Sequence, residues 1–142
     1  MGTIVHSNAF KAAVANGDVD FVGHSIKGAL MATAFVFNKD THDDWADVSA
    51  SELAAGSGYT AGGIILAGGA VAEDDANDRA NITFNDLVWT ASGGSIGPAS
   101  GVIFYDDTHA TKVIIGWDPF ASDLTATDTN TLTVSRIEFR FT

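Results

Sequence analysis

FNDLVWTASGGSIGPASGVIFYDD, residues 84–107, is the stretch that decides the fold. Its first part, FNDLVW, is mostly apolar and rich in side chains that favour strands, and so is GVIFY at 101–105. Residues 91–98 between them have the composition of a turn, with paired glycines that allow positive φ and a proline that does not fit a central strand. We therefore predict a strand, a glycine-rich loop and a second strand, with no catalytic side chain in this stretch.

The composition of the chain predicts one folded domain, residues 1–142. Its 142 residues are enough to bury about two-thirds of the surface that the unfolded chain exposes, and a hydrophobic content of 46% argues against disorder. The absence of cysteine excludes a disulfide framework and a thiolate metal site. A formal net charge of −11 argues against nucleic acid and anionic membranes as partners. The chain also shows no signal peptide and no apolar run long enough to cross a bilayer, so we expect no membrane association.

Near the N-terminus, the sequence predicts one short helix over residues 9–15. Ser7 or Asn8 is placed to cap its start, and Asn16-Gly17 to end it, because glycine suits the left-handed conformation after a helix. No other segment predicts a helix as clearly.

The segments that follow are read as strands and loops. Residues 18–22 alternate like a brief strand, and 25–37 are assigned to a strand rather than a helix because Phe-Val-Phe at 35–37 favours extended backbone. Residues 40–47 form an acidic loop. Residues 48–55 fit either a strand end or a helical turn, with Ser49 and Glu52 spaced like a capping box.

The second half of the chain predicts three more strands. They cover 81–84, 112–117 (ended by Asp118-Pro119) and 131–141, with a Thr/Asp-rich connection at 123–130. The last of these alternates between apolar and polar residues, as expected when one face of a sheet is covered. About eight short strands with turns roughly every ten residues predict an all-β fold, an antiparallel β-sandwich that is jelly-roll-like, with one short N-terminal helix.

No group of residues in the sequence assembles a recognisable catalytic, cofactor or metal site. The acidic loop at 40–47 lacks the alternating ligand order of a calcium loop, and the four histidines lack zinc spacing. Ser95 stands among glycines, but a strand follows it, whereas a nucleophile elbow leads into a helix. We therefore predict that the protein is not an enzyme and has no cofactor.

Four motifs occur in order along the middle of the chain: YTAGG at 59–63, VWTASGGSIGP at 88–98, VIFYDDT at 102–108 and IIGW at 114–117. In order and spacing they resemble a family of small virion structural proteins encoded by tailed bacteriophages and prophages. The resemblance covers residues 47–118, about half of the chain, and residues 89–98 are its most specific part. It brings no catalytic residues with it.

The resemblance implies a capsid decoration (cement) protein located in the virion, on the capsid surface. Its expected partners are the major capsid protein, whose neighbouring subunits it would bridge, and further copies of itself in a homotrimer. Two alternatives stay open. One is a tail, neck or fibre component of the virion, and the other is a carbohydrate-binding module in which exposed Trp45 or Trp117 stacks on sugar rings.

The last strand is the expected contact surface of such a protein. An edge strand pairs with a neighbour through its backbone, and apolar side chains fill the gap between subunits. The alternative is that the aromatic side chains of this strand belong to the core. The candidate interface residues are Arg136, Glu138, Phe139, Arg140 and Phe141, with Trp45 and Trp117.

Overall fold

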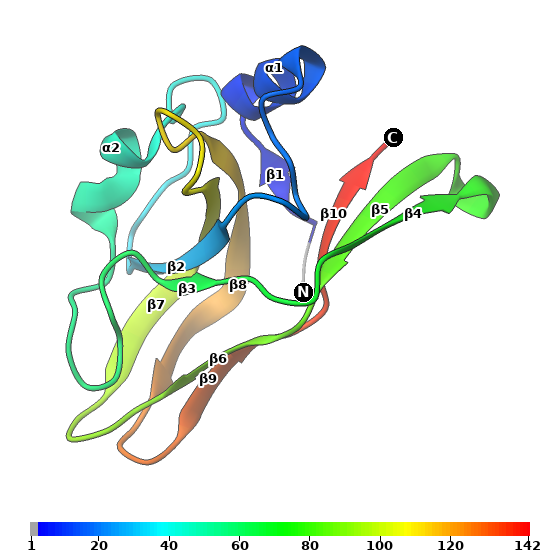
Figure 1. Ribbon diagram of the computed structural model, residues 1–142. Coiled ribbons are helices and arrows are strands. Elements are labelled where there is room, and N and C mark those ends of the chain that lie inside the picture. The colour runs from blue at the N-terminus through cyan, green and yellow to red at the C-terminus, as the bar shows by residue number, and fades with distance from the viewer. Residues whose placement is uncertain (1–2) are drawn as a thin grey trace.

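Antiparallel strands dominate residues 3–142, the part of the chain described by this computed structural model (Figure 1). In chain order the elements are β1 (Val5–His6), α1 (Asn8–Asn16), β2 (Ile26–Ala32), α2 (Trp45–Val48), η1 (Ser49–Ser51), β3 (Ile64–Ile65), β4 (Ala70–Asp74), η2 (Asp75–Asn77), β5 (Arg79–Phe84), β6 (Leu87–Thr90), β7 (Ile96–Asp106), β8 (Ile114–Ala126), β9 (Thr131–Val134) and β10 (Ile137–Phe141). The strands form sheets of five, three and two members, and none of these sheets closes into a barrel. The prediction of a mainly antiparallel β protein is confirmed.

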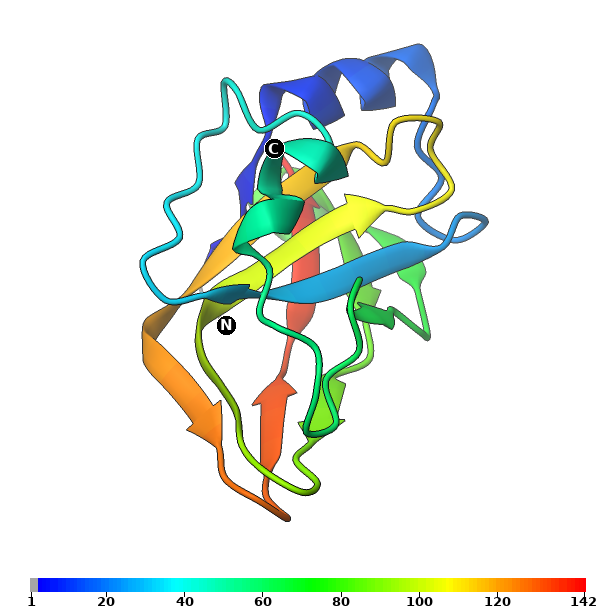
Figure 2. The same cartoon turned by 90° about the vertical axis from the view of Figure 1, so that its left-hand side faces the viewer.

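The largest sheet has the strand order β1-β8-β7-β2-β3. Its centre is the hairpin β7–β8, whose first strand comes from the second half of the stretch at 84–107. On the other side of β7, β2 pairs in a register that runs from Ile26 opposite Asp106 to Ala32 opposite Ala99. Figure 2 shows these three strands crossing the molecule side by side.

The two smaller sheets, β10-β5-β4 and β6-β9, are successive parts of one long ribbon. Phe84 lies opposite Ile137 in the first sheet, and Leu87 lies opposite Val134 in the second. Two residues therefore separate the paired segments on each strand, so the register continues across the break. At the break Arg136 has a φ of 57°, and its N–H donates to Oδ1 of Asp86 at 3.2 Å.

Both faces of the five-stranded sheet are buried. One face packs against the two smaller sheets and α1 in a shared core that includes Ile26, Leu30, Ile82, Leu87, Trp89, Val102, Phe104, Ile115, Leu132, Val134, Ile137 and Phe139. The other face is covered by the segment that follows β2, in a second cluster of Ala29, Met31, Val48, Ile103, Tyr105, Ile114 and Trp117 with Phe35, Phe37 and Trp45 against it. The near-continuous apolar runs of β2 and β7 reflect this coverage of both faces.

The predicted N-terminal helix is confirmed. Oγ of Ser7 accepts the N–H of Phe10 at 3.0 Å, so Ser7 is the N-cap. Gly17 ends the helix with a φ of 77°, and its N–H bonds back to carbonyls of the last turn.

Near the N-terminus one strand prediction is wrong, and another is confirmed only in its first half. Residues 18–22 form a loop, because the Asp20 carboxylate accepts the N–H groups of Val22 and Gly23 and turns the chain. The strand predicted over 25–37 ends at Ala32, where β2 finishes, and Ala34 has a φ of 66°. The aromatic residues after it cross the second face of the large sheet instead of continuing the strand.

Both prolines lie inside strands, which the sequence did not predict. Pro98 lies within β7, where the β8 register shifts between Ile96 and Ala99 and the β2 pairing begins only at Ala99, so its missing N–H interrupts no ladder. Pro119 does not end β8, which continues to Ala126. Beyond Trp117, no strand of the described part of the chain pairs with β8 on its β1 side, and proline is tolerated on such an edge.

The remaining differences concern residues 40–55 and the last strand. Residues 45–51 are helical, and the capping carboxylate belongs to Asp47, which accepts the N–H groups of Asp43 and Asp44, rather than to a Ser49–Glu52 box. The strand predicted over 131–141 is two strands, β9 and β10, divided at Ser135 and Arg136. The reason is the positive φ of Arg136, which interrupts the extended backbone.

Candidate functional site

The predicted contact strand, β10, lies at an edge of its sheet because it pairs with β5 on one side, and no strand within residues 3–142 pairs with it on the other. Its side chains alternate as the sequence predicts. Ile137 and Phe139 are buried, whereas Glu138 is partly exposed and Arg140 is exposed. This strand therefore presents a charged outer face over an apolar inner one.

The two aromatic residues of the predicted interface differ in accessibility. Phe139 is 0% exposed, and its ring centroid lies 5.1 Å from that of Phe104 and 5.3 Å from that of Phe21. The structure thus places Phe139 in the core of the single chain. Phe141 is partly exposed and stacks on His6 with a centroid distance of 5.9 Å and an interplanar angle of 12°.

The two tryptophans proposed as contact residues lie in the second core cluster, away from β10. Trp45 stacks on Tyr105 at a centroid distance of 4.3 Å, so that ring covers one of its faces. Trp117 is 7% exposed and meets Phe35 edge to face at 4.9 Å. The structure does not bring them together with the β10 residues.

Beside β10 lies a hollow of about 440 Å³ that gathers all three arginines of the chain. We call it the arginine hollow; it is lined by Thr3, Ile4, His6, Arg79, Arg136, Glu138, Arg140 and Thr142. Neither Arg79 nor His6 was predicted from the sequence as a site residue. The available signal was that arginine occurs only at 79, 136 and 140, but the pairing of β5 with β10 is needed to bring these positions together.

Two of the three arginines are engaged by carboxylates. Nε of Arg79 lies 2.8 Å from Oδ2 of Asp74, and Nη2 of Arg140 lies 3.1 Å from Oε2 of Glu138. The hydrogen bond that the Arg140 guanidinium donates to Glu138 raises the pKa of Arg140. Hydrogen bonds from Asn77 and then Arg79 hold the pKa of Asp74 below its usual value.

The third arginine, Arg136, is exposed, and its guanidinium forms no hydrogen bond or ion pair with residues 3–142. Burial lowers the pKa of His6, which keeps that ring neutral near pH 7. The positive charge of the hollow therefore comes from guanidinium groups, one of which has no partner among residues 3–142.

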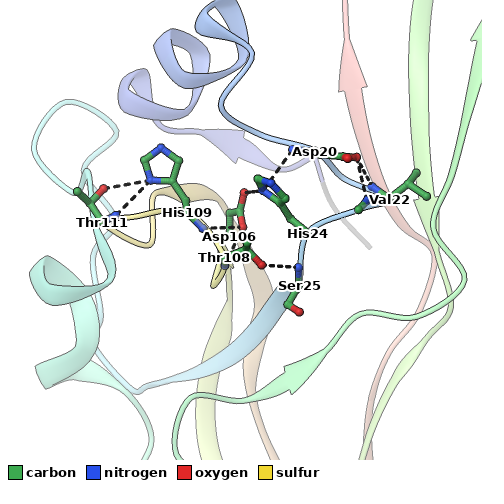
Figure 3. A network of polar contacts seen from close by, with 9 residues as sticks. Asp20, Val22, His24, Ser25, Asp106, Thr108, His109 and Thr111 are labelled. Atoms are coloured by element: carbon green, nitrogen blue, oxygen red, sulfur yellow. Dashed lines mark hydrogen bonds and ion pairs between the residues drawn. The ribbon is translucent and has the colours of Figure 1, made fainter.

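A second polar cluster, which the sequence analysis also missed, joins the start of β2 to the turn after β7 (Figure 3). Asp106 is 0% exposed, and its Oδ2 lies 2.6 Å from Nδ1 of His24. Its Oδ1 accepts the N–H groups of Thr108 and His109 at 3.0 and 3.1 Å. The N–H of Ser25 donates to the Thr108 hydroxyl at 2.9 Å.

The Asp106 carboxylate orients the ring of His24, as carboxylates do in many catalytic pairs. The other contacts of Asp106 are to backbone N–H groups of the turn after β7, so they stabilise that turn. The buried Asp106 carboxylate is satisfied by one histidine and two backbone groups, which is how a buried charge is stabilised. Among residues 3–142, no group of three or more His, Asp or Glu side chains is arranged to hold a metal ion. We assign the cluster a structural role.

The YTAGG motif at 59–63 also has a structural explanation. Oε1 of Glu52 accepts the Tyr59 hydroxyl at 2.7 Å and the N–H of Gly62 at 2.6 Å. The hydroxyl of Tyr105 donates to the Gly62 carbonyl at 2.7 Å. Burial and the Glu52 carboxylate raise the pKa of Tyr59, so this phenol stays protonated. These hydrogen bonds hold the loop at 59–63 against the large sheet.

Comparison of the chain with models of protein families, with curated proteins and with solved structures found no match. No helix within residues 3–142 has the length and apolar character needed to span a membrane. A functional assignment therefore depends on the motifs of the sequence and on the geometry of the surface around β10.

Proposed function

We propose that this protein is a capsid decoration (cement) protein of a tailed bacteriophage or prophage, and not an enzyme. It binds the outer surface of the assembled head and bridges neighbouring subunits of the major capsid protein. It acts as a homotrimer. The proposal includes the fold, which is a jelly-roll-like β-sandwich. It is supported by the core that the large sheet shares with the two smaller sheets.

The observation that carries the proposal is the surface around β10. It combines an edge strand, a half-exposed aromatic side chain at Phe141 and the arginine hollow, all supported by a buried core directly beneath. Edge strands, aromatic side chains and arginines are the groups that protein interfaces use most. A rigid strand with these groups is suited to binding a protein surface.

The charge of the chain and the number of its copies on a shell are consistent with a protein that is free before it binds the assembled head. A net charge of −11 keeps free copies soluble before they meet the head. Weak single contacts suffice on a closed shell, because many copies act together once each is anchored at more than one point.

A tail, neck or fibre component needs the same features, so it is the main alternative. The carbohydrate-binding alternative has less support. Sugar stacking requires an exposed aromatic face, whereas Trp117 is 7% exposed and Trp45 lies against Tyr105.

Immunogold labelling of intact particles made by the virus that encodes the chain tests the proposal. We expect gold on the outside of heads, and no gold when the antibody is first absorbed with the purified chain. Gold confined to tails would replace the decoration role with the alternative. Unlabelled particles that also contain none of the chain by mass spectrometry would contradict both virion roles.

A further inference from the structure

We propose that the arginine hollow binds a short acidic segment of a partner polypeptide, with carboxylates placed on Arg136 and Arg140. The identification of that partner as another virion protein rests on the proposed function. The chemistry of the site does not, because it follows from the side chains that line the hollow.

The distribution of basic residues singles out this hollow. The chain has 18 acidic and 7 basic residues, yet all three arginines line one place. Three of the four lysines are paired elsewhere, since Lys27 and Lys112 contact Asp107 and Lys39 contacts Asp40. The hollow is therefore a local positive site on an acidic molecule.

Arg136 is the group best placed to receive a ligand. It is exposed and has no ion pair with residues 3–142, while the backbone at this position is held by the bond from its N–H to Asp86. A guanidinium binds a carboxylate through two parallel hydrogen bonds, and an anchored backbone lowers the entropy lost on binding.

The hollow already contains one bound carboxylate, which indicates what chemistry it accepts. Glu138 lies 3.1 Å from Arg140 and 4.0 Å from Arg79. A phosphate dianion would sit beside this negative charge at a higher electrostatic cost than a carboxylate. A nucleic acid would in addition face the net charge of −11 along its whole length.

The spacing of the arginines favours a polypeptide over a small acid. Arg136 and Arg140 are four residues apart along the chain, so their Cα atoms are at most roughly 13 Å apart. An extended segment with acidic residues four positions apart matches them, because its own side chains repeat at the same rise.

The test uses fluorescence anisotropy with the full-length protein and a labelled Glu-Thr-Glu-Thr-Glu peptide, in which the outer glutamates are four positions apart. The matched control peptide carries glutamine in place of each glutamate. We compare wild type with Arg136→Gln, and with Lys112→Gln, which removes the same charge outside the hollow. Thermal unfolding of each variant confirms that it folds.

We expect the glutamate peptide to bind wild type, and the glutamine peptide to bind at least about tenfold more weakly, since charge-assisted hydrogen bonds are lost. Arg136→Gln should weaken binding about tenfold, and Lys112→Gln less than about twofold.

Three results would overturn the proposal: no binding of the glutamate peptide at millimolar concentration, equal losses in the two variants, or stronger displacement by inorganic phosphate or a single-stranded oligonucleotide than by unlabelled peptide. These results are independent of the labelling experiment. If the glutamate peptide binds but immunogold labels no particles, the acidic-segment site is supported and the virion role is rejected.

Discussion

At the scale of single residues, Ser7 joins helix α1 to the large sheet. Its hydroxyl accepts the N–H of Phe10 and donates to the Ile114 carbonyl at 2.5 Å, in a fully buried position. We expect Ser7→Ala to lower the free energy of unfolding by about 1–2 kcal/mol, because a cap and a buried hydrogen bond are lost together. Urea denaturation measures this change. Asn8→Ala, on the exposed neighbour, is the control, and an equal effect there would contradict the assignment of Ser7 as the cap.

Gly63 and Gly17 are a matched pair of glycines. Their φ values are 76° and 77°, but an added Cβ at Gly63 would lie 2.0 Å from the Gly28 carbonyl oxygen, whereas nothing lies within 4 Å at Gly17. We expect Gly17→Ala to cost about 1 kcal/mol from backbone strain alone. Gly63→Ala should cost about 3 kcal/mol or more, because the large sheet must also move. Similar losses in the unfolding free energy of the two variants would contradict this account of the YTAGG loop.

At the scale of the element, the alternation of β10 assigns different roles to neighbouring side chains. Phe139 is buried among aromatic rings of β5, β7 and the loop before β2. We expect Phe139→Ala to lower the free energy of unfolding by about 3–5 kcal/mol, since it leaves a cavity in the core. Val88→Ala, at a 47% exposed position of edge strand β6, should cost less than about 1 kcal/mol. A stable Phe139→Ala variant that fails only in association would instead favour a contact role for this ring.

The turn between β7 and β8 depends on an ion cluster centred on Asp107. Lys112 and then Lys27 hold the pKa of Asp107 below its ordinary value of 3.8. The unfolded chain therefore binds this proton at a higher pH than the folded chain. The stabilisation is present above the unfolded pKa and is lost as pH falls through the folded one.

We accordingly expect Asp107→Asn to be less stable than wild type at pH 7. The difference should shrink as pH falls from about 4 towards 2, where wild type also loses the charge. Urea denaturation at a series of pH values measures it. A gap that stays constant down to pH 2 would show that the carboxylate charge is not the cause.

At the scale of the whole molecule, charge and assembly are coupled. Copies with a net charge of −11 repel one another at low salt, and about 0.15 M salt shortens the range of that repulsion to about 8 Å. Under the proposed function, light scattering after gel filtration should give three times the mass of 14.7 kDa in this salt, and smaller species in dilute buffer. A chain that stays monomeric at all salt concentrations and never associates with heads would reject the proposed function.

Local patterns in the sequence predicted much of the fold. Ser7 and Gly17 marked the ends of α1 because capping depends on residues within one turn of the helix. The alternation around Phe139 and the apolar run at 101–105 predicted strands, because burial of one or both faces of a strand leaves a period in the sequence itself. The sequence by itself thus determined a β-rich chain with one capped helix.

Contacts between distant residues decided the rest. Pro98 and Pro119 are tolerated only because of where neighbouring strands start and stop pairing, which no local pattern contains. The link between His24 and Asp106 joins positions 82 residues apart. The arginine hollow forms because β5 pairs with β10 and brings Arg79 towards Arg140. Strand pairing is set by the burial of the whole core rather than by any one segment, so only the tertiary structure could assemble this surface.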